Sequence, residues 1–290
     1  DALHLSKFTD RSVQEILRHV TDTQILSHLI DPRERIDGGT GHSLKALCAH
    51  YVDPDSPDGQ TALKARFKEL GLKLDEGFAK IPLWDETFVR YAGLDVILTA
   101  RLLPKLLVEI KPSFSHLIDF EHEVQRITTS MTERGMAVDT NYTLGLLHDL
   151  QMEQEDAERT ALKLGVQNVN STKQVASSLM IRGVTLVEKT PSGAWKVDKN
   201  ILQEINDPLA EAVLTAKEAS KASSSWVSPI LHHGNIDGRV HCRMKTLAAR
   251  TSRMSISNPP LQQLPSNDHR IRSCLVADLG MKLVACDFKQ

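Results

Sequence analysis

No segment of the 290-residue sequence comes close to the roughly 18 consecutive apolar residues that a helix needs to cross a lipid bilayer. The first residues also lack the basic and then apolar stretches of a secretory signal peptide. Low-complexity segments are missing too, while 41% of the residues are apolar, which is enough for two or three packed units. We therefore expect a soluble, globular protein with no membrane or secretory function.

Cysteine is scarce, and its spacing excludes two further classes of protein. No pair forms a CxxC motif and no histidine stands at metal-ligand spacing, which argues against both a zinc site and a disulfide framework. A reducing, cytoplasmic compartment fits best. The four cysteines are Cys48, Cys242, Cys274 and Cys286.

The sequence begins with Asp1 rather than methionine, and Gln290 follows an apolar run without a terminating signal. We therefore expect a fragment. The net charge of -2 also hides an asymmetry, because Lys217–Gln290 contains eleven Lys/Arg against five Asp/Glu and the rest is acidic. A basic C-terminal part favours a polyanionic partner there.

Helical periodicity dominates the chain. Short helices are predicted within 13–30 and 44–51, and a longer one from Asp85 whose end Pro104 disturbs. A domain boundary is predicted at Lys111-Pro112. Further helices are predicted at 117–135, 141–159, after 170–172, and as one long element over 207–226.

Beyond Asp237-Gly238 the period of the sequence changes from helical to two. The alternation predicts a strand with one apolar and one wholly basic face. A second run, Met281–Phe288, predicts a buried strand that delivers Asp287 to a sheet edge. The alternating residues are Val240, Cys242 and Met244 against Arg239, His241, Arg243 and Lys245.

Three motifs follow one another near the C-terminus: Thr251–Gln263 (TSRMSISNPPLQQ), Arg270-Ile271-Arg272 and Asp287–Gln290 (DFKQ). Their order resembles that of the family A (polymerase I type) DNA polymerases, where the corresponding stretches read TGRLSS, RRIR and DYSQ. The resemblance implies template-directed nucleotidyl transfer by a two-metal mechanism with Mg²⁺, using template-primer DNA and deoxynucleoside triphosphates.

By this resemblance Asp287 is the catalytic carboxylate that bridges the two metal ions, and the backbone of Phe288 lies beside the incoming nucleotide. Arg253 corresponds to the arginine that enters the minor groove, where acceptors of all four base pairs lie in similar positions. Gln262 and Gln263 stand where the family contacts the template-primer duplex.

Other basic residues are candidate DNA contacts. His241 and Arg243 lie on the basic strand face, and an exposed charged strand is the alternative interpretation. Lys221, which follows Lys217 on a predicted helix, resembles the thumb lysine that holds the duplex backbone, although a solvated helix face explains it almost as well.

Asn170–Gln174 (NSTKQ) resembles the start of a thumb helix in the family. Free backbone N–H groups and the positive end of the helix dipole can bind a phosphate there. Ser171, Thr172 and Lys173 are the candidate DNA contacts.

Tyr91 and Asp95 form a YxxxD pattern that resembles the third motif of proofreading exonucleases, in which Asp binds metal and Tyr orients the attacking water. Core packing is the alternative for Tyr91. Asp1 is a candidate for the aspartate of the second exonuclease motif, and thus a third metal ligand, whereas Asp22 is interpreted as a helix cap.

The predicted fold is mixed α/β and mainly helical. The resemblance implies that residues 1–111 are the C-terminal part of a DnaQ/RNase H-like 3′-5′ exonuclease domain, 112–236 the helical thumb, and 237–290 the first palm strands. Ser252 in place of the usual glycine, among other departures, puts the detailed duplex contacts in doubt and favours a divergent, bacteriophage member.

We expect the parent protein to be a replication or repair polymerase, and this chain by itself to be inactive because partner carboxylates for both sites are missing. Two alternatives stay open. One is a non-catalytic DNA-binding part of a split polymerase, and the other is a stand-alone exonuclease with a vestigial polymerase arm.

Overall fold

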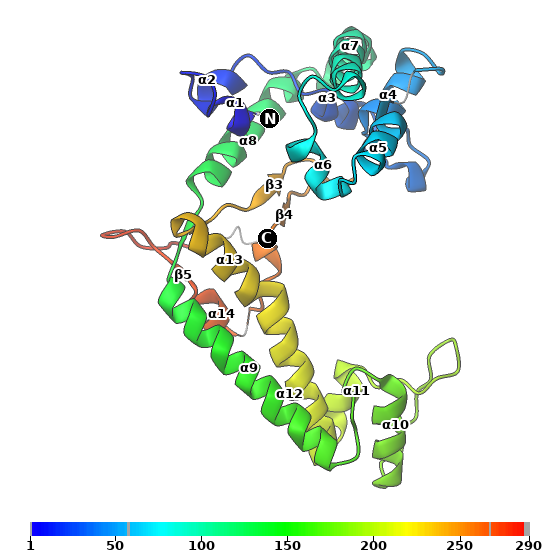
Figure 1. Cartoon of the computed structure of the whole chain (residues 1–290), viewed down its shortest axis with the longest axis vertical. Helices are drawn as coiled ribbons and strands as arrows, with labels where there is room; N and C mark the ends of the chain where they lie inside the picture. The colour runs from blue at the N-terminus through cyan, green and yellow to red at the C-terminus, as the bar shows by residue number, and fades with distance from the viewer. Residues whose placement is uncertain (1, 57–58, 267, 287–290) are drawn as a thin grey trace. The chain divides into compact units, whose positions relative to one another are not determined.

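The computed structural model describes residues 2–56, 59–266 and 268–286 (Figure 1). Contacts between residues divide the chain into two compact units. Unit 1 contains the chain up to Glu133 together with the returning segment Met244–Ser255, and unit 2 contains Arg134–Arg243 and the chain from Ile256 onward. The mainly helical, mixed α/β fold predicted from the sequence is confirmed.

Several helices of unit 1 begin at polar capping residues. Ser43 and Asp85 each accept a hydrogen bond from a backbone N–H in the first turn of the helix that follows, which satisfies a donor left free at a helix start. The elements are α1 (Ala2–Leu5), α2 (Val13–Leu17), α3 (Thr23–Ile30), η1 (Arg35–Asp37), α4 (Leu44–Tyr51), α5 (Gly59–Glu69), α6 (Leu74–Lys80), α7 (Glu86–Glu109), η2 (Pro112–Phe114) and α8 (His116–Arg134).

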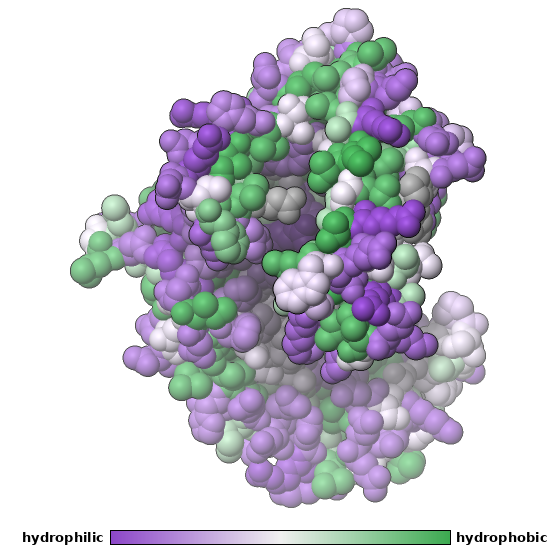
Figure 2. Space-filling model, turned by 45° about the horizontal axis from the view of Figure 1, so that its top comes forward, coloured by the Kyte–Doolittle hydropathy of each residue, from purple (hydrophilic) through white to green (hydrophobic). Residues whose placement is uncertain are grey.

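The sequence predicted that Pro104 disturbs the end of helix α7. The helix instead continues past the proline to Glu109. Leu102 and Leu106, on either side of the proline, are both fully buried and pack against α3 and α4. Their burial offsets the backbone hydrogen bond that Pro104 cannot donate. In contrast, other apolar residues of α7 are exposed, including Val96 and Val108, and Figure 2 shows hydrophobic residues among hydrophilic ones on the face in view.

Unit 2 is organised around two helices that lie side by side, α9 (Thr140–Lys163) and α12 (Pro208–Ala222) (Figure 1). Their shared core is rich in alanine, including Ala161 and Ala216, and small side chains allow the helix backbones to approach closely. The same core continues into α10 (Thr172–Ile181) and α11 (Lys199–Glu204).

The single helix predicted over 207–226 is wrong beyond Ala222. A π-helix, η3 (Ser223–Val227), follows α12, and α13 (Ser228–Asp237) follows η3. Pro229 at the start of α13 has no N–H with which to continue the α-helical bonding pattern, so the chain changes its hydrogen-bond register before it.

A small antiparallel sheet in unit 2 has the strand order β2-β1-β5. Met136 pairs with Val240, and Val138 pairs with Leu275, so β1 lies in the middle. The strands are β1 (Met136–Val138), β2 (Arg239–Val240) and β5 (Leu275–Val276), and the short helices η4 (Leu261–Gln263) and α14 (His269–Arg272) precede β5.

The single alternating strand predicted after Gly238 is interrupted. Strand β2 pairs with β1, whereas β3 (Arg243–Lys245) pairs with β4 (Ser255–Ser257), so two different partners divide the run. The alternation itself holds in part, because Val240 and Cys242 are buried.

The buried strand predicted over 281–288 is not formed within 281–286, the part of it that the structure describes. Met281 and Val284 are 65% and 81% exposed. No described strand pairs with this run, and an unpaired β-type segment does not bury its apolar face. In the described residues, no helix is both long and apolar enough to span a membrane.

Candidate nucleic-acid interface

Tyr91 and Asp95 lie together on one face of α7, as their four-residue spacing predicts. Burial, and then a hydrogen bond from the phenol to the Asp95 carboxylate, raise the pKa of Tyr91, while a hydrogen bond with Gln60 lowers it. Gly59, which sequence reasoning missed, makes room for the pair, since a Cβ there would lie 3.0 Å from Tyr91 Cδ2. The face combines a protonated phenol with a carboxylate.

Three of the predicted site residues, Asp1, Asp287 and Phe288, lie outside the described residues. Asp95 is therefore the one predicted metal ligand that the structure describes. Over residues 2–56, 59–266 and 268–286, no group of three or more His, Cys, Asp or Glu side chains could hold a metal ion. Asp22 caps α3 by accepting from the Gln24 backbone at 2.8 Å, in agreement with its interpretation as a cap.

The start of α10 has the predicted capped form. The Ser171 hydroxyl accepts a hydrogen bond from the Gln174 backbone, and the Gln174 side chain accepts from the backbone of Asn168 at 3.1 Å. These bonds fold the preceding loop onto the helix start. Thr172 and Lys173 are exposed there. The positive N-terminal end of the helix dipole and the Lys173 ammonium are therefore both accessible from solvent.

Lys217 and Lys221 lie one turn apart on α12 and line the same cleft, which has a volume of about 700 Å³. Burial lowers the pKa of Lys217. The ammonium of Lys221 lies 5.4 Å from the centre of the Trp226 ring, within the range of a cation–π interaction. Arg270 on α14 lines the cleft as well, but it is held by Asp268 and Glu153.

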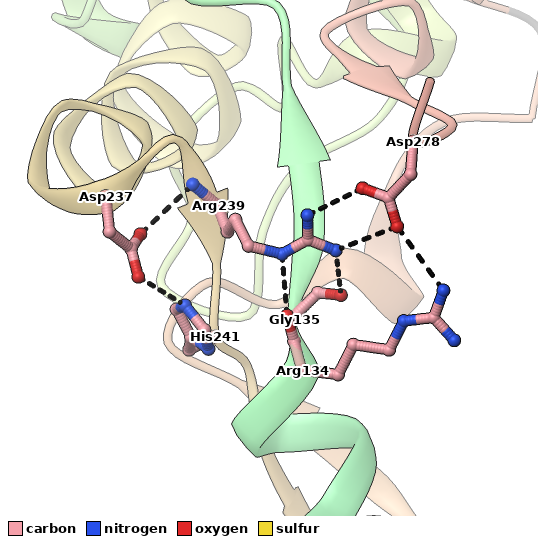
Figure 3. Close-up of polar contacts among 6 residues, drawn as sticks. All are labelled: Arg134, Gly135, Asp237, Arg239, His241 and Asp278. Carbon is pink, nitrogen blue, oxygen red and sulfur yellow. Dashed lines mark hydrogen bonds and ion pairs between the residues drawn. The ribbon is translucent and has the colours of Figure 1, made fainter. Parts of the chain in front are cut away.

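The guanidinium of Arg239 fixes strand β2 by hydrogen bonds to other segments of unit 2 (Figure 3). We call this set of bonds the Arg239 strut. The guanidinium donates to Asp278 at 2.6 Å and to the backbone oxygens of Arg134 and Gly135. Arg134 reaches Asp278 too, at 3.3 Å, and the Arg239 hydrogen bond lowers the pKa of Asp278. The wholly basic strand face predicted from the sequence is therefore wrong for Arg239, because its charge is neutralised within the fold.

His241 lies next to the Arg239 strut and forms a hydrogen bond with Asp237, whose carboxylate is 2.9 Å from His241 Nε2 (Figure 3). This hydrogen bond lowers the pKa of Asp237. Two residues further along, Arg243 is exposed at the start of β3. The Asp237 contact orients the imidazole, whereas the guanidinium of Arg243 faces solvent.

Gln262 and Gln263 are brought close to His241 and Arg243 by a buried contact that the sequence did not indicate. Cys242, the residue between the two basic side chains, hydrogen-bonds to the backbone of Leu261 at the start of η4, and burial raises the pKa of its thiol to about 11. Both glutamines of η4 are exposed. Two amides and two basic groups thus lie on neighbouring segments of unit 2.

Arg253 is exposed in the loop between β3 and β4, within unit 1. Ser252 before it has φ 57°, in the left-handed region that only glycine adopts without strain. The serine therefore adds local strain beside the arginine.

Replacing Ser252 by Gly should raise the free energy of unfolding by about 0.5–1 kcal/mol, because relief of left-handed strain exceeds the entropy cost of glycine. Urea unfolding followed by circular dichroism measures the change. Ser266→Gly, at an exposed serine with an ordinary φ, is the matched control and should lower stability slightly. Equal effects of the two substitutions would contradict the strain at residue 252.

Two family models match successive parts of the chain. The family model described as DNA polymerase family A matches residues 140–290, and the model described as 3'-5' exonuclease matches residues 6–111. The chain is 33% identical over 278 residues to the DNA polymerase of Mycobacterium phage D29, covering 93% of this chain and 46% of the relative. It is 29% identical over 286 residues to DNA polymerase I of Synechocystis sp., covering 93% and 27%.

Among solved structures, the POL domain of Pol1 from M. smegmatis, in complex with DNA primer-template and dNTP, shares this fold. The TM-score is 0.61 at 21% identity, over 89% of this chain and 41% of that one. The chain thus spans less than half the length of these relatives.

Proposed function

The chain belongs to DNA polymerase family A, and from this premise we propose that it is part of a DNA-directed DNA polymerase that extends a primer in replication or repair. Residues 6–111 contribute to a 3′-5′ proofreading exonuclease, and the later part contributes the thumb and the beginning of the palm. The protein acts on DNA in the cytoplasm of a bacterial cell or a phage-infected host.

The observation that carries the proposal is the grouping of His241, Arg243, Gln262 and Gln263 around the buried Cys242 contact. Basic side chains hold phosphates, which fixes the register of a duplex without reading its sequence. Amide groups can donate to the base acceptors that recur at similar positions in the minor groove. This combination suits a protein that must hold any template-primer sequence equally well.

The thumb residues extend the same interface. Lys217 and Lys221 point from one face of α12 into one cleft, and Lys173 stands at the exposed start of α10. Each ammonium that meets a backbone phosphate releases condensed counterions, so the affinity they contribute depends on salt but not on sequence.

Mg²⁺ is the proposed cofactor, with Asp287 as its ligand in the polymerase site and with Asp95 and Asp1 in the exonuclease site. Carboxylate oxygens are the ligands that Mg²⁺ prefers, and the ion supplies charge neutralisation on the reacting phosphate. Asp95 fits such a role, since it is a carboxylate beside a phenol that stays protonated. With the ion bound, Tyr91 would orient the attacking water in the exonuclease site, and the proposed role of Phe288 is to flank the incoming deoxynucleoside triphosphate in the polymerase site.

The purified 290-residue chain is expected to bind template-primer DNA and not to extend it. The double substitution Lys217→Ala/Lys221→Ala should weaken binding about tenfold or more and reduce the slope of log affinity against log salt by about two, one for each lost phosphate contact. Fluorescence anisotropy with a labelled hairpin primer at several salt concentrations measures both quantities.

Lys199→Ala is the matched control, because Lys199 lines the same cleft but pairs with Glu218 at 2.7 Å. Its substitution should change the affinity less than twofold. If the double variant binds as tightly as the unchanged chain, the α12 lysines are a solvated helix face and not part of the interface. Primer extension by the chain alone with Mg²⁺ would overturn the expectation that it is inactive.

A further inference from the structure

The loop that carries Arg253 is bound to a distant part of unit 1. His28, on α3, is 221 residues away from Ala249 in the sequence, and its Nε2 lies 3.3 Å from the Ala249 backbone oxygen. One residue further, the guanidinium of Arg250 lies 3.8 Å from the carboxylate of Asp37 in η1. The loop thus has two polar anchors on one segment of the exonuclease region.

The Ala249 oxygen has a second function in the same loop. It accepts a hydrogen bond from the Ser252 backbone at 2.8 Å, which closes the turn immediately before Arg253. A carbonyl oxygen has two lone pairs and can accept both bonds. His28 therefore holds the atom that shapes this turn, and the strained φ of Ser252 means that the turn gains from such external support.

The donor that faces the loop is well defined. His28 is only 6% exposed, and its ring packs on His42 with 5.3 Å between ring centres. A carbonyl oxygen only accepts, so Nε2 of His28 carries the proton. Ser27 donates its hydroxyl to the Gln24 backbone and therefore accepts from Nδ1 of His42. Nε2 of His42 is buried without a hydrogen-bond partner among the described residues.

We propose that His28 and Asp37, with His42 packed behind, are positioning residues that hold the turn at Ala249–Ser252 and so set where Arg253 meets the primer terminus. This inference rests on the proposed minor-groove contact of Arg253. It assigns to the exonuclease region a function in polymerisation that needs none of the exonuclease's own chemistry.

The arrangement depends on a neutral His28. Burial, followed by the neighbouring His42, lowers the pKa of His28, while the bond to Ala249 and the carboxylates of Glu34 and Asp31 oppose this shift. Because the folded-state pKa of His28 lies below the unfolded value, the stability that neutral His28 contributes is present above about pH 6.5 and is lost as the pH falls through the folded pKa. Protonation strengthens the Nε2 donation to Ala249, but the cost of a buried charge beside His42 is larger, since the pKa of His28 is lowered overall, and the buried anchor becomes less stable.

The test uses the complete polymerase. His28→Leu should lower kcat/KM for a matched template-primer about tenfold, mainly by raising KM for DNA, whereas His28→Gln keeps an amide donor and should lose less than threefold. Asp37→Asn should lower it about threefold by weakening the second anchor. The exposed His19 is the matched control, and His19→Leu should have no effect. Circular dichroism confirms that each variant is folded.

A double-mutant cycle with Arg253→Ala decides whether His28 acts through the arginine. In the Arg253→Ala background, His28→Leu should add less than a twofold loss. Multiplied losses, or no loss from either anchor variant, would overturn the inference while leaving the polymerase assignment intact. If Arg253→Ala itself has no effect, the proposed minor-groove contact fails, and the inference fails with it.

The pH profile gives a second readout. Unchanged protein should lose extension efficiency from pH 7 to pH 5.5 more steeply than His28→Gln, because glutamine has no proton to gain. Identical profiles would contradict an anchor that depends on neutral His28.

Discussion

Asp95→Asn in the complete polymerase is expected to reduce 3′-5′ exonuclease activity at least about a hundredfold while primer extension stays unchanged. Asparagine keeps the shape of the side chain but removes the anionic oxygen that a metal ion and the Tyr91 phenol need. Asp95 is partly exposed on α7, so this substitution should not disturb packing. Release of nucleotides from a mispaired 3′ end, measured beside extension of a matched primer, separates the two activities.

Asp119→Asn, at an exposed aspartate on α8, is the matched control and should alter neither activity. Tyr91→Phe should lose less than Asp95→Asn, about tenfold, since the phenol orients water and does not bind metal. Loss of extension together with proofreading would favour a stand-alone exonuclease with a vestigial polymerase arm. Unchanged proofreading would show that the Tyr91–Asp95 face is ordinary packing.

Gly135→Ala is expected to lower the free energy of unfolding by about 3 kcal/mol, which is the sum of left-handed strain and overpacking. Gly135 has φ 63°, and a Cβ there would lie 2.8 Å from the Val240 oxygen and 2.9 Å from the His241 ring. The neighbouring backbone belongs to the β1–β2 pair and cannot move without breaking the Arg239 strut. Thermal unfolding should show a melting temperature lower by roughly 5–10 °C.

Gly145→Ala supplies a control of opposite sign. Gly145 is exposed within α9, and a Cβ there would meet nothing within 4 Å. Alanine should therefore stabilise the helix by about 0.5–1 kcal/mol. If both glycine variants change stability by the same amount and sign, the close approach at Gly135 does not constrain the fold.

The Gly135→Ala substitution should also weaken DNA binding. The strut holds β2, and β2 leads directly to His241 and Arg243. A displaced strand would move these side chains away from the two glutamines of η4. DNA affinity should therefore fall in Gly135→Ala even at temperatures where the variant is folded.

The order of local elements could be read from the sequence because each depends on neighbours in the chain. The helices predicted near residues 44, 85, 172 and 207 begin within one residue of those positions, because a capping bond reaches only two or three residues along the chain; the caps are Ser43, Asp85, Ser171 and Asp207. The family could also be predicted, because motifs in order are a property of sequence alone.

Tertiary structure decided what local patterns could not. Pro104 predicts a disturbed helix, but burial of Leu102 and Leu106 carries α7 past it. The run from Arg239 to Lys245 alternates like one strand, but a strand exists only where a partner supplies hydrogen bonds, and here two partners divide it.

Tertiary contacts also decide which candidate residues are exposed and which are paired within the fold. Arg239 and Arg243 look alike in the sequence, yet one is neutralised by Asp278 and the other faces solvent. His28 has no signal that could link it to Ala249, because a contact across 221 residues depends on how α3 and the loop fold together. Residue types and spacing thus determined the family, the helices and the candidate chemistry. Only packing between distant segments decided which charges face solvent and which contacts hold the turn at Ala249–Ser252.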